Sequence, residues 1–308
     1  MPGRSYCKVL RGLRVKAPLG CSLLGDTRGY DNMAAMKDII RFALGPAVVA
    51  GLLLLCGMST ARPAGTDRVD ARFEIYGFAG LHVLTDRTTM METADRYVIA
   101  TDLDTRGLAR VFVDLTSHSE VHGRLAGEKL YPSNYRAGVR RNGVDRQYGL
   151  DYRGDGAVVN VSPPPSSGRP LLVAEQHIQN TVDQLTAFFM VERQLAQRGT
   201  CTLTVPVYDG AGFYDLRFTG VKREMLSADG YQNFAGPAQV CDVVREDIVV
   251  NPNRDEDTYR HGKIWYARLI VGDRLVPVRM EFDTAFGAVK GYLAELHGRG
   301  VYLHLMGE

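Results

Sequence analysis

The segment "HSEVH" brings together, at close spacing, residue types that could do chemistry. His118, Glu120 and His122 occupy alternate positions of a run with strand propensity, so all three would lie on one face of a strand. The two histidines would then be roughly 13 Å apart, which is too far for both to bind one metal ion. A solvated strand face is the preferred interpretation. A hydrolase or metal-dependent enzyme with a site near His118 and Glu120 is the alternative.

Other positions offer little for catalysis. Asp209 stands in an Asp-Gly turn, where an aspartate usually bonds its own backbone. The sequence has no nucleophile elbow, no phosphate-binding loop and no isolated pair of carboxylates. We therefore predict no catalytic residue, no metal site and no cofactor.

The amino terminus has the pattern of an export signal. An uncharged apolar run of about 15 residues, at positions 42–56, follows Lys37 and Arg41 and precedes Ser59 and Ala61, the small residues typical of a cleavage site. We expect residues 33–64 to be a signal peptide and residues 1–32 to be an extension that does not belong to the working protein. A membrane anchor is the alternative, although the run is shorter than the roughly 20 residues that a spanning helix needs.

Removal of this segment changes both charge and cysteine content. Residues 1–64 hold nine of the 37 basic and three of the 35 acidic residues, so the formal charge of +2 becomes about −4, and no basic stripe remains for nucleic acid. Only Cys201 and Cys241 are left, and two cysteines in an oxidising compartment most often pair. We expect a disulfide between them, with Cys241 on a strand beside the one that begins at Cys201. Two unpaired thiols and a redox-active pair are the alternatives.

Strands are predicted almost throughout residues 65–308, which we expect to form a single domain, because apolar residues alternate between short turns. Asp209 to Gly212 should form one hairpin turn. A second hairpin is expected to turn at Gly272-Asp273 alone. That register would place Trp265 opposite Met280 on a buried face and Tyr266 opposite Arg279.

One amphipathic helix is expected over residues 181–198. Thr181 and Gln184 have the spacing of a capping box, and Gly199 follows Arg198 at the other end. A single apolar stripe should pack on a sheet; it comprises Val182, Leu185, Phe188, Phe189 and Leu195. The proline-rich residues 162–170 are expected to form a connector that crosses the sheet as a strap.

Six segments in this order carry a family resemblance: "RFEIYGFAGL", "YPSNYR", "NTVDQLTAFF", "CTLTVPVYDGAGFYDL", "YQNFAGPAQVCDV" and "LVPVRMEFDTAFGAV". The chain resembles the exported bacterial domain-of-unknown-function family 3108. That family is similar in architecture to envelope integrity protein B and, more loosely, to Lol-type lipoprotein carriers, whose curved antiparallel sheets wrap around a helix. The resemblance brings no established catalytic residues.

These observations predict a mainly β protein, a strongly curved antiparallel sheet or open β-barrel with the amphipathic helix on its concave side. We expect a non-enzymatic periplasmic protein that binds a lipid, another apolar ligand or an envelope partner and supports envelope integrity. Leu185, Phe188 and Phe189 are the expected ligand or partner surface. Membrane contact is expected only through the signal peptide, and no contact with nucleic acid.

Overall fold

Alternating apolar residues form strands along most of the chain that the computed structural model describes, which comprises residues 67–162, 175–210, 212–249, 259–284 and 287–306. The strands are β1 Asp67–Tyr76, β2 His82–Glu92, β3 Arg96–Thr105, β4 Leu115–Ala126, β5 Lys129–Arg141, β6 Val144–Tyr152, β7 Val158–Ser162, β8 Leu203–Tyr208, β9 Phe213–Leu226, β10 Gly236–Val249, β11 His261–Ala267, β12 Val276–Thr284, β13 Gly287–Gly298 and β14 Val301–His304. The expected extension, signal peptide and nearly all of the connector lie outside the described residues.

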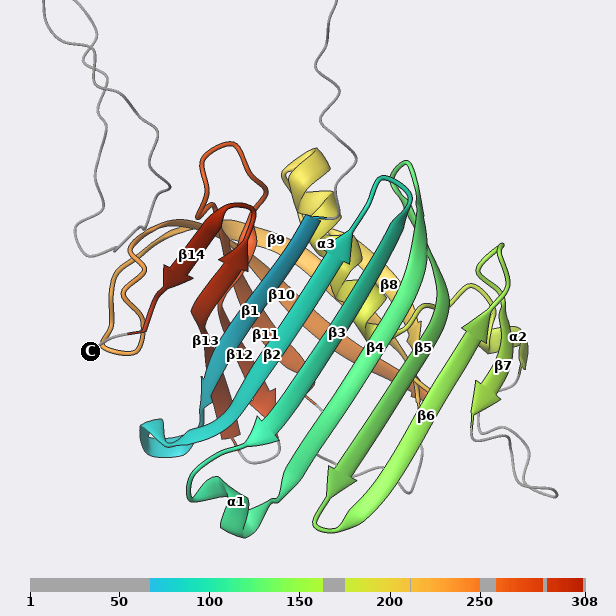
Figure 1. Ribbon diagram of the computed structural model, residues 1–308, viewed down its shortest axis with the longest axis horizontal. Coiled ribbons are helices and arrows are strands. Elements are labelled where there is room, and N and C mark those ends of the chain that lie inside the picture. Colours follow the sequence, from blue (N-terminus) through green and yellow to red (C-terminus); the bar gives the residue numbers. More distant parts are fainter. Residues whose placement is uncertain (1–66, 163–174, 211, 250–258, 285–286, 307–308) are drawn as a thin grey trace, which may run out of the picture. The chain divides into compact units, whose positions relative to one another are not determined.

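All named strands join one antiparallel sheet (Figure 1). Its order is β7-β6-β5-β4-β3-β2-β1-β13-β12-β11-β10-β9-β8, and β14 adds to β13 beside this path. The pairing of β1 with β13 joins the first and last thirds of the chain. Within the described ranges no ladder connects β7 to β8, so the sheet remains open.

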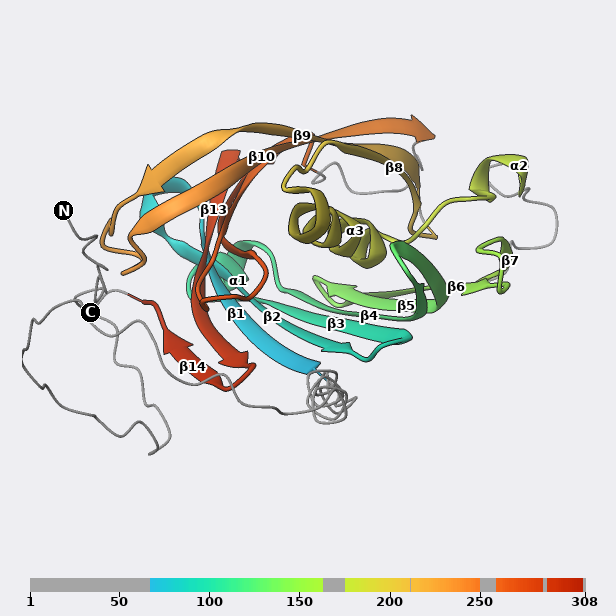
Figure 2. The same ribbon diagram turned by 90° about the horizontal axis from the view of Figure 1, so that it is seen from above.

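Helix α3, Gln184–Arg198, lies inside the curve of this sheet (Figure 2). One side of the helix packs on a cluster from β3 to β6, where Phe189 contacts Tyr97. The other side packs on a cluster from β8 to β11 through Val191 and Leu195. The predicted fold class, a curved antiparallel sheet with a helix on its concave side, is therefore confirmed, but the helix buries two faces instead of one stripe. The shorter helical elements are η1 Phe78–Gly80, α1 Ala109–Phe112 and α2 Glu175–Ile178.

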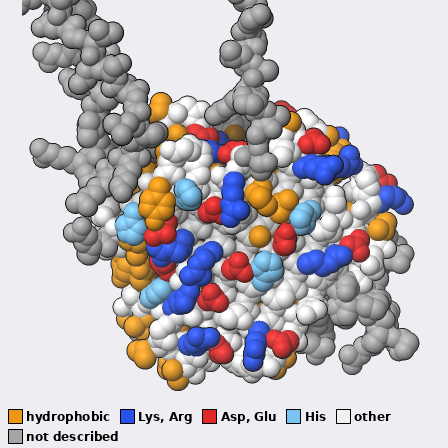
Figure 3. All heavy atoms as spheres, viewed as in Figure 1, with side chains coloured by type: hydrophobic (Ala, Val, Ile, Leu, Met, Phe, Trp, Pro, Cys, Tyr) orange, Lys and Arg blue, Asp and Glu red, His pale blue; other side chains and the backbone are white. Residues whose placement is uncertain are grey.

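The outer face of β1 to β6 is polar and charged (Figure 3). Along β1, Arg68, Asp70, Arg72 and Glu74 alternate with the inward residues, and they form ion pairs with each other or with neighbouring strands. The pair of Arg68 with Asp70 is exposed to solvent and stabilises the sheet only slightly, whereas Glu74 is buried beside Arg72. The inward residues of the same strands therefore supply the apolar surface on which α3 rests.

The expected hairpin at Gly272-Asp273 is wrong. β11 ends at Ala267 and β12 begins at Val276, and these two residues pair with each other across an eight-residue connection, residues 268–275. Trp265 consequently lies opposite Arg279, whose guanidinium stacks 4.8 Å above the indole ring, and Tyr266 lies opposite Pro277. The strands cannot extend further because side chains of the connection pair elsewhere in the protein, as described below.

The predicted start of the helix is also wrong, by about one turn. Asp183 is the N-cap, and its carboxylate accepts hydrogen bonds from the backbone N–H of Thr186 at 2.9 Å and from the hydroxyl of Thr186 at 2.7 Å. Thr181 instead donates to the carbonyl of Ile178, and Val182 forms a parallel bridge with Val207. The predicted end is confirmed, because Gly199 has a φ of 67° and its N–H bonds the carbonyl of Leu195.

Candidate functional site

A small cavity lies beside the second half of α3, between the helix and the inner face of the sheet. Its volume is about 70 Å³, enough for a few water molecules or the end of an apolar chain. Apolar side chains from four strands dominate its wall. The lining residues are Val69, Ala71, Phe73, Thr88, Met90, Glu192, Arg274, Val276, Pro277, Leu293, Leu296 and Arg299.

Glu192 is the one carboxyl group in this wall. Loss of hydration raises its pKa from 4.5 to about 7, although Arg274 and Arg299 act in the opposite direction. No hydrogen bond to the Glu192 carboxylate is present among the described residues. A carboxyl in this state can donate or accept a hydrogen bond near neutral pH, so it could orient the polar end of a bound molecule.

Two ion-pair groups close the cavity on the side of the 268–275 connection. Glu92, at the end of β2, lies 2.7 Å from a guanidinium nitrogen of Arg193 and 2.7 Å from one of Arg274. Arg299, in the turn after β13, bonds Asp273 at 2.9 Å and Asp67 at 2.8 Å. Asp273 and Arg274 thus hold the connection over the cavity, which is the reason that β11 and β12 end before it.

The predicted ligand residues lie near this site but in packed positions. Phe189 is only 1% exposed, with its ring centre 5.3 Å from that of Tyr97. Phe188 is half-buried and meets Phe218 edge-on at 5.6 Å, and half-buried Leu185 packs with the cluster around Phe189. None of the three lines the cavity. Their contact with a ligand stays a prediction.

The sequence interpretation missed Glu192, Arg274 and Arg299. Glu192 had a visible signal, because it falls seven residues after Leu185, four after Phe188 and three after Phe189, within the apolar stripe of the helix. A charged residue at such a position must find solvent, a partner or a ligand. The two arginines carried no comparable signal, because only the folded sheet brings their connections to the helix.

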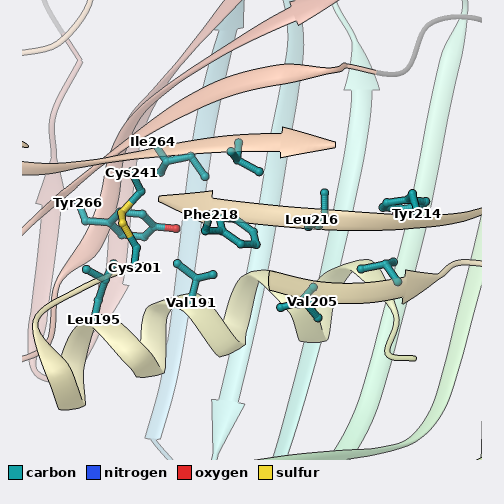
Figure 4. Close-up of a cluster of buried hydrophobic side chains, with 13 residues drawn as sticks. Val191, Leu195, Cys201, Val205, Tyr214, Leu216, Phe218, Cys241, Ile264 and Tyr266 are labelled. Atoms are coloured by element: carbon teal, nitrogen blue, oxygen red, sulfur yellow. A yellow bond between two sulfur atoms is a disulfide. The ribbon is translucent and has the colours of Figure 1, made fainter. Parts of the chain in front are cut away.

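Cys201 and Cys241 are joined by a disulfide, as expected, with their Cα atoms 6.1 Å apart (Figure 4). The strands are not neighbours as predicted: Cys201 precedes β8, Cys241 lies on β10, and β9 runs between them. The bond crosses β9 at Gly220, which pairs with Cys241. A Cβ at Gly220 would lie 3.6 Å from the sulfur of Cys201, so a larger side chain would meet the disulfide.

Asp209 caps the expected hairpin between β8 and β9. Its carboxylate accepts a hydrogen bond from the N–H of Gly212 at 2.8 Å. The backbone N–H of Asp209 in turn bonds the carbonyl of Gly212. The predicted turn is confirmed, and the role of this aspartate in it is structural.

His118, Glu120 and His122 lie together on the exposed outer face of β4. His118 bonds Asp102 at 2.7 Å, and His122 bonds Glu120 at 2.7 Å. All four side chains are more than a third exposed. Within the described ranges, no three His, Cys, Asp or Glu side chains converge where they could hold a metal ion. The arrangement is that of a solvated strand face.

The fold and this site define a class of protein, an open curved antiparallel sheet wrapped around one helix with an apolar cavity between them. The family described as "Protein of unknown function (DUF3108)" matches residues 72–294, and the chain belongs to it. No curated protein matches the chain in sequence. Among solved structures, the chain is similar to a beta-barrel-like protein of domain of unknown function DUF1849 from Brucella abortus, with 10% identity and a TM-score of 0.43, over 75% of this chain and 98% of that one.

The expected similarity to envelope integrity protein B and to Lol-type carriers stays a prediction. No described helix is long and apolar enough to cross a membrane.

Proposed function

We propose that this protein is a non-enzymatic, exported protein of the cell envelope that binds an apolar ligand in the cavity beside α3. The observation that carries the proposal is the wall of that cavity: eight apolar side chains surround one carboxyl group that has no hydrogen bond within the described structure. Mainly apolar walls with a few polar groups, here Thr88, Glu192, Arg274 and Arg299, are typical of sites that bind small molecules. The lining residues include no serine, cysteine, histidine or lysine to act as nucleophile or base.

Export is supported by the disulfide between Cys201 and Cys241, because such bonds persist in oxidising compartments. The apolar run at residues 42–56, followed by small residues, supports the same conclusion. With this location, the proposal extends to a role in envelope integrity, through the ligand or an envelope partner.

Binding of a ligand larger than the cavity requires part of the protein to move. At about 70 Å³ the cavity admits the end of a chain, so a longer molecule requires displacement of the 268–275 connection. The ion pairs of Asp273 and Arg274 tie that connection to residues around the cavity, and Leu269 and Leu275 of the connection also pack on the apolar clusters of the sheet. Its release would lengthen the cavity without opening the sheet.

Mass spectrometry of apolar molecules that co-purify with the protein from its native envelope tests the proposal. Ala71→Phe should fill the cavity and reduce the co-purifying ligand, whereas Ala126→Phe, at an exposed residue of β4 that does not line the cavity, should not. Overpacking costs about 1–3 kcal/mol, so thermal unfolding of Ala71→Phe must show that the fold is retained. Absence of any apolar molecule from the native protein, or equal amounts in both variants, would contradict the proposal.

A further inference from the structure

Both arginines in the wall of the cavity beside α3 already have carboxylate partners. A guanidinium nitrogen of Arg274 lies 2.7 Å from Glu92. Arg299 forms ion pairs with Asp67 at 2.8 Å and with Asp273 at 2.9 Å. An anionic ligand would have to displace one of these carboxylates before it could pair with either arginine.

Glu192 is the charged group of this wall that has no partner. Arg193, the next residue along α3, also pairs with Glu92, so three arginines and three carboxylates make up the two ion-pair groups beside the cavity. Their formal charges cancel. Glu192 forms no hydrogen bond or ion pair within the described structure, so its ionised form adds one uncompensated negative charge.

The other polar groups that the structure describes near Glu192 supply no positive charge. The hydroxyl of Thr88, in the wall, lies 3.3 Å from Asp86 and 3.3 Å from Thr101, to which it can donate. Burial raises the pKa of Asp86 and, more strongly, that of Tyr266, on which the charge of Glu192 acts in the same direction. Tyr266 is therefore neutral near neutral pH, and Asp86 is neutral or negative. A cation is thus the group that would complement this site.

We propose, on the basis of the function proposed above, that the ligand of this cavity is a single-chain amphiphile whose polar end is a protonated amine. The ammonium group donates hydrogen bonds to Glu192 and compensates its charge. The first carbons of the chain lie against the apolar wall, which includes Ala71, Phe73 and Leu293. A carboxylate or phosphate end instead meets a second negative group in apolar surroundings, and a hydroxyl end leaves the charge of Glu192 uncompensated.

Three probes of equal chain length test the polar end: octylamine, octanol and octanoate. At pH 8 the amine is protonated, the carboxylate is ionised and the alcohol is neutral. Isothermal calorimetry on the processed protein recovered from cells should give octylamine an affinity about tenfold or more above that of octanoate, with octanol between them, because only the amine forms an ion pair. Octanoate or octanol binding as tightly as octylamine would overturn this proposal but leave an apolar ligand site in place. Absence of binding by all three would overturn the proposed function as well.

Removal of the charge at Glu192 gives an independent measurement. Glu192→Gln should weaken octylamine binding by about tenfold or more and change octanol binding by less than about threefold. Glu128→Gln is the matched control, because the side chain of Glu128 lies between β4 and β5, is 60% exposed, pairs with Arg198 and does not line the cavity. This control should bind octylamine as the native protein does. Equal octylamine affinity in all three forms would overturn the proposal.

Proton release from the native protein tests the same contact without any substitution. At pH 6 the carboxyl of Glu192 is mostly protonated, because loss of hydration raises its pKa to about 7. An ammonium group beside it favours the ionised form, so octylamine binding should transfer a proton from Glu192 to the buffer, whereas octanol binding should not. Calorimetry in two buffers of different ionisation enthalpy measures this release. Equal release with both probes, or none with octylamine, would overturn the proposal.

Discussion

Helix α3 carries two carboxyl groups in poorly hydrated surroundings, and they differ in their hydrogen bonds. Asp183, at the first turn, is fully buried, and burial raises its pKa to about 6. Glu192, in the second half, has a pKa raised to about 7 by the same cause. Asp183 accepts hydrogen bonds from the N–H and hydroxyl of Thr186, whereas Glu192 has none within the described structure.

The difference separates a structural role from the ligand-binding role that we propose for Glu192. Asp183 satisfies the first backbone N–H groups of the helix, so its burial is compensated by bonds that the fold needs. Glu192 costs free energy when ionised and faces an apolar cavity. A raised carboxyl pKa alone would not have distinguished the two groups.

The largest effect is expected from Asp183→Ala, measured at pH 5, where the raised pKa keeps the carboxyl of Asp183 neutral. The substitution leaves the N–H of Thr186 without an acceptor in a buried site and leaves its hydroxyl with the Tyr97 hydroxyl alone, at 3.0 Å, which should lower the free energy of unfolding by about 3 kcal/mol. Urea denaturation measures this loss. Asp183→Asn, which keeps one acceptor, is the control and should lose less. A loss below about 1 kcal/mol for Asp183→Ala would show that the hydrogen bonds of Asp183 do not stabilise the fold as we expect.

Glu192→Gln should stabilise the protein at pH 8, the opposite of the effect expected from Asp183→Ala. Glutamine removes a charge that is poorly hydrated, and Arg274 and Arg299 keep their bonds to Glu92 and Asp273. We expect the free energy of unfolding to rise by about 2 kcal/mol, somewhat less than the full pKa shift would imply. A decrease in the same urea experiment would show that the ionised carboxylate stabilises the fold.

The pH dependence should distinguish the two groups further. A carboxyl whose pKa is raised in the folded state holds its proton to higher pH than in the unfolded chain, so the free energy of unfolding falls as pH rises between the two values. The contribution of Glu192 should disappear between pH 4.5 and about 7, and that of Asp183 between pH 3.8 and about 6. Stability measured from pH 4 to 8 should therefore depend less on pH in Glu192→Gln, above all at the upper end. Parallel curves for this variant and the native protein would contradict the assignment.

The smallest effect is expected from Thr181→Val. Thr181 does not cap α3, and the substitution removes only its hydrogen bond to the carbonyl of Ile178, which should cost about 1 kcal/mol. Calorimetric unfolding of this variant and of Asp183→Ala compares the two positions directly. A greater loss of stability for Thr181→Val than for Asp183→Ala would indicate that Thr181 caps the helix, as the sequence pattern predicts.

Much of the fold was accessible from local patterns. Alternation of apolar residues predicted the strands, the Asp-Gly turn at Asp209 predicted the β8–β9 hairpin, and Gly199 marked the end of the helix. The β11–β12 register was not accessible, because Asp273 and Arg274 bond residues far away in the sequence. The prediction of the helix start was wrong for a similar reason. Thr181 and Asp183 are both residue types that cap helices well, and only packing selects between them.

The sequence by itself determined the strand alternation, the single helix and the pairing of two cysteines, because these depend on residue types at short spacing or on the absence of other partners. Only the tertiary structure decided that β9 separates those cysteines, that Gly220 leaves room for their bond, and that Glu192 faces a cavity with Arg274 and Arg299. The pairing of β1 with β13 brings the cavity residues from the first and last thirds of the chain together. Hydration and ion pairing depend on that three-dimensional neighbourhood, which no local pattern records.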